Sequence, residues 1–506
     1  MNWLDRAIAS VAPVYGKRRM EARAALGRYE AARPSRNRKL IRDHASGDVH
    51  VQRDAAQLRS SARDLERNHD LARGVLSVMT RNIVGAQGIG IEPAPRMRDG
   101  SINTDLARDL RGLHHEWCKR PEVTWCHGFA SMQRLACRAW LRDGEMFGQL
   151  LSGGVPGLDH GTAVPFSVEM LEADLVPLDY EYPSERIRQG VELNAWGRKV
   201  AYHVYKGHPG DGGLVFGSLF PALKRVGADR IVHPYMADRI SQVRGVSIFA
   251  SIITRLMDVK DYEESERVAA KVAASMAGYI CKGTPDLYEG PATDAEKNRP
   301  QMKFSPGMIF DDLLPGEEIG TIDTKRPSDQ VSDFRNAMLR AAASGADVGY
   351  SSVSRNYDGT YSAQRQELVE QWAAYAVLAD QFVAQFVRPI WERFVFAAAA
   401  AGQIRVTRDI DVQHLADADF RVPPMPWIDP VKEAKALKIL VDNKFKSRQQ
   451  VIRERGGSWD DVISQWGEEN RDAGSEGLSL EPDAAADDPT TEQDDDEESN
   501  NRRQRA

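Results

Sequence analysis

The sequence has little cysteine and no long apolar run. Four cysteines in 506 residues (Cys118, Cys126, Cys137 and Cys281) are too few for a disulfide framework, and they predict free thiols in a reducing compartment. No stretch of about 18 apolar residues occurs, so we expect no membrane span. The first residues run into Lys17-Arg18-Arg19 without an apolar core and a cleavage site, which predicts that no signal peptide is present.

The common catalytic motifs are absent as well. The sequence contains no phosphate-binding Gly-x-x-x-x-Gly-Lys-Ser/Thr, no Gly-x-Ser-x-Gly and no His-Glu-x-x-His. Asp143 and Glu145, and the Asp311-Asp312 pair, could support acid–base or Mg²⁺ chemistry. Turn positions and solvated faces explain these carboxylates more simply. We therefore predict no catalytic, cofactor-binding or metal-binding residues.

One group of histidines and cysteines resembles a metal site only in composition. It comprises His114, His115, Cys118, Cys126, His127 and Cys137. The spacings match no zinc pattern, and Cys137 falls inside an ordinary helical segment. The favoured interpretation is buried thiols and surface histidines.

Charge is distributed unevenly along the chain. Residues 1–73 carry 16 basic against 9 acidic side chains, whereas residues 468–506 carry 14 acidic against 4 basic ones. The part between them is close to neutral, so it does not have the basic character of a protein that grips nucleic acid by neutralising phosphates. The N-terminal part is interpreted as an amphipathic arm with a solvated basic face; contact with a nucleic acid or an acidic neighbour is the alternative. The C-terminal part is predicted to be disordered.

Residues Tyr361 to Ala400 are predicted to form one unbroken helix. Apolar side chains recur there every three or four residues and form a stripe along one face. At 1.5 Å per residue such a helix would span roughly 60 Å, which suits a scaffold better than the wall of a small active site. The preceding Ser351–Thr360 is polar and aperiodic, and it predicts an exposed loop.

The rest of the sequence predicts an α+β protein that is mainly helical. A long helix at Val246–Ile280 and a second at Ser328–Ala343 flank a compact excursion at about 282–325. Other helices are expected at Asn68–Ile83, Asp105–Lys119, Ser131–Asp143, Val431–Asn443, Arg448–Glu454 and Trp459–Trp466. Strands are expected at Glu145–Leu151, Phe166–Leu171, Ala201–Tyr205, Gln403–Arg408 and Asp419–Val422.

This order of parts resembles the portal proteins of tailed double-stranded DNA bacteriophages, and the lambda-type portal family in particular. Short stretches spread over about residues 65–466 carry the resemblance, and none of them is specific alone. They are Arg67–Arg73, Asn82–Gly85, Arg142–Glu145, Glu169–Asp174, Tyr361–Arg365, Arg388–Trp391, Trp427–Glu433, Ser447–Gly456 and Trp459–Val462.

The resemblance implies a portal fold with wing, stem, clip and crown. Its expected divisions are a basic N-terminal arm (1–73), an α+β wing domain (74–245), a first stem helix (246–280), a clip (281–325), a second stem helix (326–346), a tunnel loop (347–360), a long wing helix with closing strands (361–430), a helical crown (431–467) and a disordered acidic tail (468–506).

The resemblance also implies a function without catalysis. Portals form rings, usually of twelve subunits, at one capsid vertex of the virion, and double-stranded DNA passes through them during packaging and ejection. The expected partners are further copies of the chain, the terminase large subunit, the major capsid and scaffold proteins, and head–tail connector proteins. Assembly would take place in the host cytoplasm, and no membrane is involved.

Within this scheme Arg355, Asn356 and Tyr357 would offer weak contacts to the DNA backbone, although an ordinary flexible loop explains their composition equally well. Two other functions remain as alternatives. One is a Mg²⁺-dependent nuclease or ATPase of the packaging machinery that uses Asp311 and Asp312, and the other is a monomeric helical adaptor.

Overall fold

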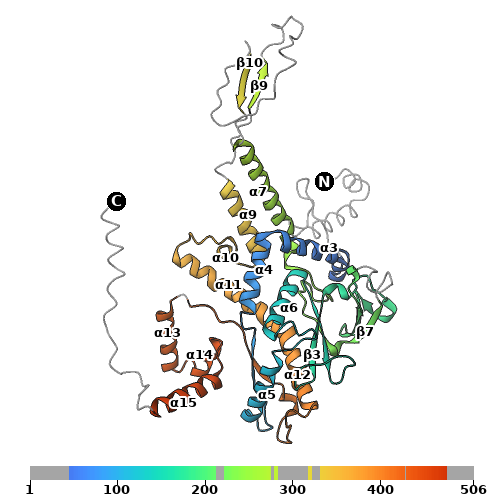
Figure 1. The fold of residues 1–506 in the computed structure, drawn as a ribbon, viewed down its shortest axis with the longest axis vertical. Helices are drawn as coiled ribbons and strands as arrows, with labels where there is room; N and C mark the ends of the chain where they lie inside the picture. Colours follow the sequence, from blue (N-terminus) through green and yellow to red (C-terminus); the bar gives the residue numbers. More distant parts are fainter. Residues whose placement is uncertain are drawn as a thin grey trace, which may run out of the picture.

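The structure is a computed structural model, and it describes residues 45–211, 222–274, 278–282, 317–321, 331–427 and 429–475. A body of helices and small antiparallel sheets carries a projecting pair of helices, which we call the stalk, and a separate group that we call the C-terminal helices (Figure 1). The mainly helical α+β fold is confirmed. The stalk consists of α7 (Ile253–Ala274) and α9 (Val331–Gly345), and the C-terminal helices are α13 (Pro430–Asp442), α14 (Arg448–Glu454) and α15 (Trp459–Ser475).

The first described helices belong to the body. Helix α3 (Gly47–Asn68) is followed after one residue by α4 (Asp70–Ile83). Helix α3 buries Val51, Ala55 and Leu65, which recur at helical spacing and face the body. The predicted N-terminal arm is therefore wrong from residue 47 to residue 73, because those residues carry a core-facing stripe. Residues 1–44 lie outside the described part.

Three small antiparallel sheets shape the body. A three-stranded sheet has the order β3-β2-β8, a four-stranded one has the order β4-β5-β6-β7, and β1 pairs with β11 from far along the chain. The strands are β1 (Gly90–Pro93), β2 (Phe147–Ser152), β3 (Phe166–Leu171), β4 (Ile187–Arg188), β5 (Val191–Leu193), β6 (Lys199–Tyr205), β7 (Leu223–Gly227), β8 (Ile231–Val232) and β11 (Ala418–Arg421). The strand predicted at Gln403–Arg408 is wrong, since those residues form turns and irregular chain.

Two helices, α5 (Thr104–Trp117) and α6 (Phe129–Asp143), complete the body beside these sheets. Single 3₁₀ turns lie at Ala173–Leu175, Pro183–Glu185, Pro209–Asp211, Ala228–Arg230, Ile248–Ser251 and Val412–His414.

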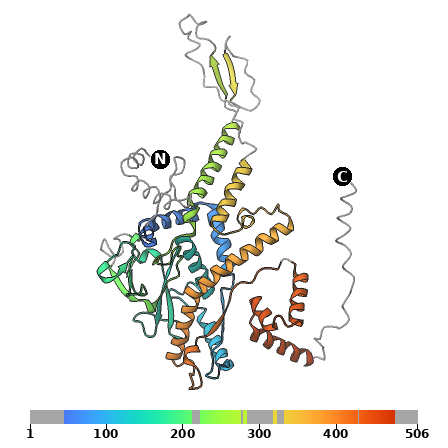
Figure 2. The ribbon, with the colours of Figure 1, turned by 180° about the vertical axis from the view of Figure 1, so that it is seen from behind.

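The predicted long helix crosses the body, as Figure 2 shows from behind. It consists of α11 (Tyr361–Phe382), a π-helical turn at Val383–Val387 and α12 (Arg388–Ala400). The continuous helical path is thus confirmed, with one feature that periodicity did not predict. Pro389 has no N–H to donate to the preceding turn, and the wider π turn accommodates that loss without ending the helix.

Aromatic rings pack along α12. Trp117 stacks on Phe166 with 5.4 Å between ring centroids and lies 5.3 Å from Phe394, which in turn stacks on Trp391. Both indole N–H groups are satisfied, because Trp117 donates to the Phe166 carbonyl and Trp391 to the Ala416 carbonyl, each at 2.8 Å. This cluster joins α5, β3 and α12 into one core.

A buried carboxylate, Glu145, lies at the centre of the body with no exposed surface. Arg244, also fully buried, reaches it at 2.7 Å, Arg59 at 2.8 Å and His233 at 3.0 Å, while the Gly245 N–H donates at 3.0 Å. Burial opposes ionisation of Glu145, but the charge of Arg244, the His233 hydrogen bond and the charge of Arg59 outweigh it and hold the pKa well below its usual range. The prediction of a solvated turn carboxylate is wrong for Glu145.

A second set of ion pairs extends this centre toward α3. Arg63 lies 2.9 Å from Asp143 and 2.5 Å from Asp174, and Arg142 bonds both Asp143 and Glu66 at 2.8 Å. The stretches around Asp143 and Asp174, which carried part of the family resemblance, are therefore structural: they tie α3, α6 and the 3₁₀ turn after β3 together.

Gly144, between Asp143 and Glu145, has to be glycine. Its φ is +85°, and a Cβ there would lie 2.2 Å from the Val246 carbonyl carbon. This close approach brings Arg244 and Glu145 into one buried pair.

The first stalk helix begins later and ends earlier than predicted. Residues 246–252 form a 3₁₀ turn and irregular chain before α7 starts at Ile253, and Gly278–Lys282 is not helical but a strand, β9, paired antiparallel with β10 (Glu317–Thr321). The strand contains the β-formers Tyr279 and Ile280. The prediction of one helix over 246–280 is therefore wrong at both ends. Most of the predicted clip, 281–325, lies outside the described residues.

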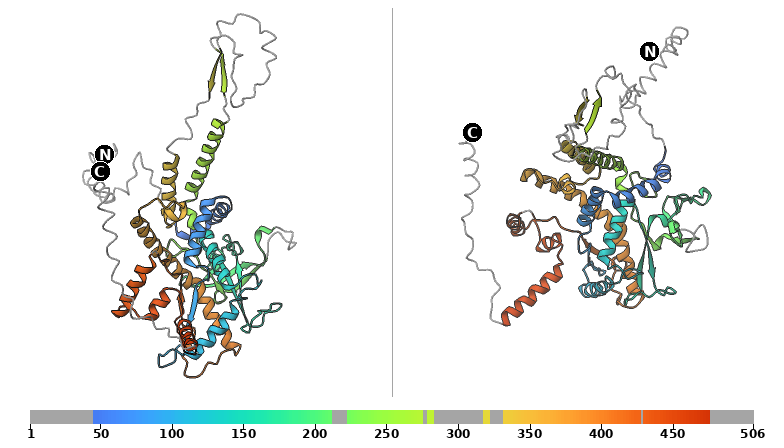
Figure 3. Two further views of the ribbon diagram at one scale, coloured as in Figure 1. Left: turned by 60° about the vertical axis from the view of Figure 1, so that its left-hand side comes forward. Right: turned by 45° about the horizontal axis from the view of Figure 1, so that its top comes forward.

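The two stalk helices lie side by side and project from the body toward β9 and β10 (Figure 3). An ion pair of 2.5 Å joins Arg335 to Glu263, and the rings of Tyr262 and Phe334 lie 4.6 Å apart.

The C-terminal helices confirm the three helices predicted there, but the last one is longer. Helix α15 continues to Ser475, so the predicted disordered tail is wrong over 468–475, and residues 476–506 lie outside the described part. None of the described residues in α13, α14 or α15 is buried. Among all described helices, none combines the length and the apolarity that crossing a membrane would require.

Candidate nucleic-acid interface

The predicted loop is partly helical. Residues Tyr350–Ser354 form a short helix, α10, so the irregular chain before α11 is limited to residues 355–360. Arg355 ends α10 in the left-handed conformation, with φ +57°. Arg355 is exposed, Asn356 is half-buried, and the Tyr357 side chain is 56% exposed. The three predicted residues are thus adjacent on an accessible loop.

Hydrogen bonds within the segment give the loop its shape. The Asn356 side chain accepts from the Asp358 N–H at 3.0 Å, which is a local turn typical of asparagine. The Gln364 side-chain amide donates to the carbonyls of Tyr357 and Gly359. The Thr360 hydroxyl, as the N-cap residue, accepts from the N–H of the third residue beyond it at 3.4 Å. The loop is therefore fixed on the first turns of α11.

Helix α10 connects the loop to both α11 and the stalk. Glu367 of α11 accepts from the Ser351 N–H at 2.9 Å and from its hydroxyl at 2.6 Å. The Tyr350 hydroxyl donates to Asn336 of α9 at 3.1 Å. Gly349 permits this packing, because a Cβ there would lie 1.0 Å from the side-chain nitrogen of Gln371. Loop, stalk and long helix are mechanically connected through these contacts.

A hollow of about 200 Å³ lies between the loop and α11. Tyr357 lines it together with Tyr361 and Arg365, whereas Arg355 and Asn356 do not. Tyr361 and Arg365 were not among the residues predicted for this loop. The signal was present, since residues 357, 361 and 365 are four apart at the start of a predicted helix.

The chemistry of this loop is limited to weak contacts. Residues 355–360 contain one cation, Arg355, and one carboxylate, Asp358, so their formal charges cancel. Two exposed tyrosines, Tyr357 and Tyr361, offer ring faces and hydroxyl groups. Such a set can touch a phosphate backbone or a neighbouring chain, but it holds no group positioned for catalysis.

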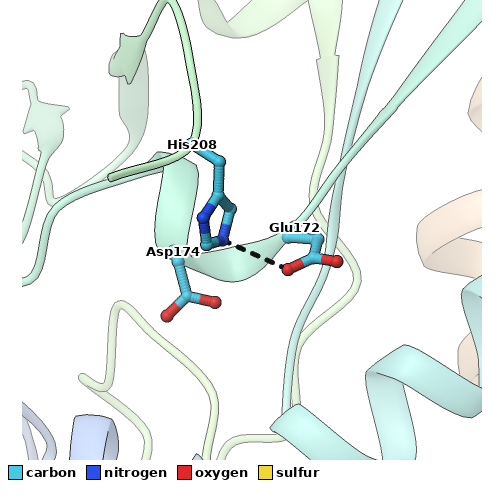
Figure 4. Close-up of side chains that lie close together, drawn as sticks. All are labelled: Glu172, Asp174 and His208. Atoms are coloured by element: carbon cyan, nitrogen blue, oxygen red, sulfur yellow. Dashed lines mark ion pairs between the residues drawn. The ribbon is translucent and has the colours of Figure 1, made fainter. Parts of the chain in front are cut away.

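One group of possible metal ligands occurs among the described residues, and Figure 4 shows it: Glu172, Asp174 and His208, whose ligand atoms lie within 4.8 Å of one another. Arg63 lies 2.5 Å from Asp174 and 3.7 Å from Glu172, and Arg59 lies 3.3 Å from Asp174. These guanidinium groups already balance the two carboxylates. The arrangement is that of an ion-pair cluster, and we assign no metal to it.

The histidines and cysteines named above do not converge on such a site. His114 is half-buried and packs against aromatic rings. Desolvation there, with a smaller contribution from His115, lowers its pKa to about 4. Burial raises the pKa of the Cys118 thiol to about 12 and that of Cys137 further. The interpretation as buried thiols is correct for Cys137, and that of surface histidines is correct for His115, while His114 is half-buried. Cys126 is exposed.

Comparison with known proteins relates the chain to phage portals. A family model described as phage portal protein, lambda family, matches residues 33–378. A probable portal protein of Halomonas phage phiHAP-1 is 23% identical over 449 residues, covering 85% of this chain and 83% of the relative. The portal protein of Escherichia phage N15 is 22% identical over 466 residues, covering 84% and 86%. Portal protein B of Escherichia phage lambda is 23% identical over 335 residues, covering 60% and 62%.

Among solved structures, a chain from the virion of a native gene transfer agent particle aligns with 14% identity and a TM-score of 0.44. The alignment covers 80% of this chain and 93% of that one. A chain from the neck of the native particle, computed with C12 symmetry, gives a TM-score of 0.41 at 14% identity, covering 80% and 94%.

Proposed function

The chain belongs to the lambda family of phage portal proteins, and from this premise we propose that its copies form a closed ring, of twelve subunits, around an axial channel for double-stranded DNA. It is a structural portal component of the virion. In the proposal the ring occupies one capsid vertex, where DNA enters during packaging and leaves during ejection.

Exposed apolar side chains on the projecting elements carry the proposal. Val268 of α7 is 53% exposed and Phe334 of α9 is 43% exposed, while Val369 and Val377 on the outer face of α11 are 45% and 68% exposed. A projecting helix pair with so little buried surface gains most of its stability by packing against other elements. Copies placed side by side in a heterologous, closing interface would cover these side chains.

The charges of the proposed channel elements favour passage over retention of DNA. Helix α7 contains five carboxylates and four cations, and the loop before α11 has one of each. Each phosphate that a protein neutralises adds a sequence-independent contribution to binding, so a channel for moving DNA needs few unbalanced cations. The near-neutral surface fits this requirement. Arg355, Asn356 and Tyr357 would make only transient contacts with the backbone.

The remaining assignments follow the family. In the proposal the body and α11–α12 form the wing, the stalk forms the stem, residues 355–360 form the tunnel loop, and the C-terminal helices form the crown. The clip, 281–325, would bind the terminase large subunit and later head–tail connector proteins, and the wing would meet the major capsid and scaffold proteins. Assembly would take place in the host cytoplasm. We propose no catalytic activity for the chain.

Particle mass and imaging of the full-length protein test the proposal. Native mass measurement and negative-stain images should show rings of roughly half a megadalton or more, as expected for closed cyclic assembly. The variant Val377→Asp should lose the ring but keep its far-UV circular dichroism, because Val377 is exposed in the single chain. A protein that remains at 56.4 kDa at micromolar concentration would support the monomeric adaptor instead. ATP or DNA hydrolysis that disappears in Asp311→Ala would support the enzyme; Asp311 lies outside the described residues.

A further inference from the structure

Two adjoining hollows on the body form what we call the arginine groove. The larger, about 940 Å³, lies where α5, α6 and β1 meet, and the smaller, about 400 Å³, lies between α4 and α6. Ser131 and Arg134 line both, so the two hollows lie next to each other. The arginines that line them are Arg81, Arg108, Arg111, Arg134, Arg138 and Arg421.

Three of these arginines have no ion-pair partner among the described carboxylates: Arg81, Arg134 and Arg421. Arg81 is exposed. Arg134 donates only to the backbone carbonyls of residues 85 and 86. Arg421 donates to the carbonyl of residue 456 at 3.4 Å, and its buried Nε has no hydrogen-bond partner. A buried guanidinium donor without an acceptor is costly, so the groove has capacity for additional anionic oxygens.

Carboxylates from the C-terminal part of the chain already lie at the edge of this groove. Asp460 of α15 lies 2.6 Å from Arg111, and Asp461 lies 3.5 Å from it. Asp461 also lines the larger hollow. The beginning of α15 is thus attached to the groove by the kind of contact that its unpaired arginines can still form.

The chain beyond α15 is also rich in carboxylates. Residues 476–506 contain 11 carboxylates and 3 arginines, and Asp494 to Glu498 are five consecutive carboxylates. The segment is long enough to reach back from the end of α15 to the groove. Helix α15 rises roughly 21 Å between Asp461 and Ser475, and about seven extended residues would span that distance. Asp494 lies 19 residues beyond Ser475.

We propose that the acidic C-terminal segment, residues 476–506, binds in the arginine groove and covers its unpaired guanidinium groups. The segment then acts as an electrostatic shield that competes with other polyanions for Arg81, Arg134 and Arg421. The docking does not depend on the proposed function. Its consequence does: in a protein that conducts DNA, the shield would keep a phosphate-binding surface from gripping the duplex.

Arginine accessibility in the full-length protein tests the docking. Hydroxyphenylglyoxal labels free guanidinium groups, and mass spectrometry of the peptides gives the rate at each arginine. In the variant D494N/D495N/D496N/E497Q/E498Q, the reagent should modify Arg81 and Arg134 several-fold faster than in the unchanged protein. Arg198, exposed in the turn between β5 and β6, is the internal control and should label equally in both. About 1 M NaCl should remove the difference, because it screens the attraction.

Duplex binding supplies the second measurement. At low salt the tail-neutralised variant should bind a short DNA duplex at least tenfold more tightly than the unchanged protein, and adding Arg81→Glu should abolish that gain. Arg81→Glu is suited to this purpose because the side chain is exposed, and unchanged far-UV circular dichroism of the variant checks that its fold is intact. Equal labelling of Arg81 and Arg134 in both proteins would overturn the proposal. The proposal would also be overturned if Arg81 and Arg134 of the unchanged protein were protected from the reagent only when duplex is added, since the groove would then bind DNA and not the acidic segment. Ring formation, measured separately by particle mass, reports on the proposed function and not on the docking.

Discussion

The body and the C-terminal helices hold their charged residues in different surroundings. In the body, Glu145 and Arg244 are completely buried and bonded to each other and to several further groups. The C-terminal helices bury none of their described residues, and they meet the body through ion pairs. One joins Arg453 to the buried carboxylate Glu92, and another joins Asp460 to Arg111.

The difference indicates how the two regions are made stable. A buried ion-pair centre is destabilising unless every member is bonded, so the geometry of the body is tightly specified within one chain. The described residues of the C-terminal helices bury no apolar side chain against the body. Phe445 and Trp466, for example, are 77% and 56% exposed. The body is therefore a frame held together by buried contacts, whereas the C-terminal helices are attached to it mainly through charged side chains.

The largest expected effect comes from Glu145→Gln, which tests the frame. Removing the charge leaves Arg244 buried without its counter-ion and takes the closer of two carboxylates from Arg59, which keeps only Asp174. Breaking one partner of a buried pair costs about 3–5 kcal/mol. The melting temperature, followed by intrinsic fluorescence, should fall by many degrees. Glu116→Gln is the matched control, because Glu116 pairs with Lys119 on the exposed surface. An unchanged melting temperature for Glu145→Gln would mean that the ionic centre contributes nothing to the frame.

A smaller effect is expected from Arg453→Ala, which tests the attachment of the C-terminal helices. Arg453 of α14 lies 3.0 Å from Glu92, a buried carboxylate of β1, and 3.0 Å from Asp419. Its loss leaves Glu92 buried without a charge partner, which should lower the free energy of unfolding by about 1–3 kcal/mol. Amide hydrogen exchange in α14 and α15 should accelerate while exchange in α6 stays unchanged.

The control for this experiment is Lys446→Ala, which removes an ion pair to Glu454 within the C-terminal helices and leaves the contact with the body intact. If both variants accelerate exchange equally, the attachment to the body does not hold these helices in place.

The same contrast explains what the sequence could predict. The long helix at Tyr361–Ala400 was predictable, because its apolar spacing is local. The stretch around Glu145 was recognisable, but its role was not: the partners Arg59 and Arg244 are 86 and 99 residues away, and no spacing rule connects them. The short helix α10 was missed since its serines are poor helix formers, and it depends on Glu367 for its bonds.

The smallest expected effect concerns the loop before α11, where one cation and one carboxylate oppose each other. Arg355→Gly removes the cation at a position with φ +57°, which glycine adopts without strain, so the melting temperature should not fall. If Arg355 touches phosphate during passage, the salt dependence of duplex binding should decrease by about one counter-ion per contact. Asp358→Asn is the matched opposite change and should strengthen binding at low salt, because it leaves Arg355 unopposed. Opposite shifts of the two variants would place this loop at the DNA, whereas no shift in either would leave it a connector between α10 and α11.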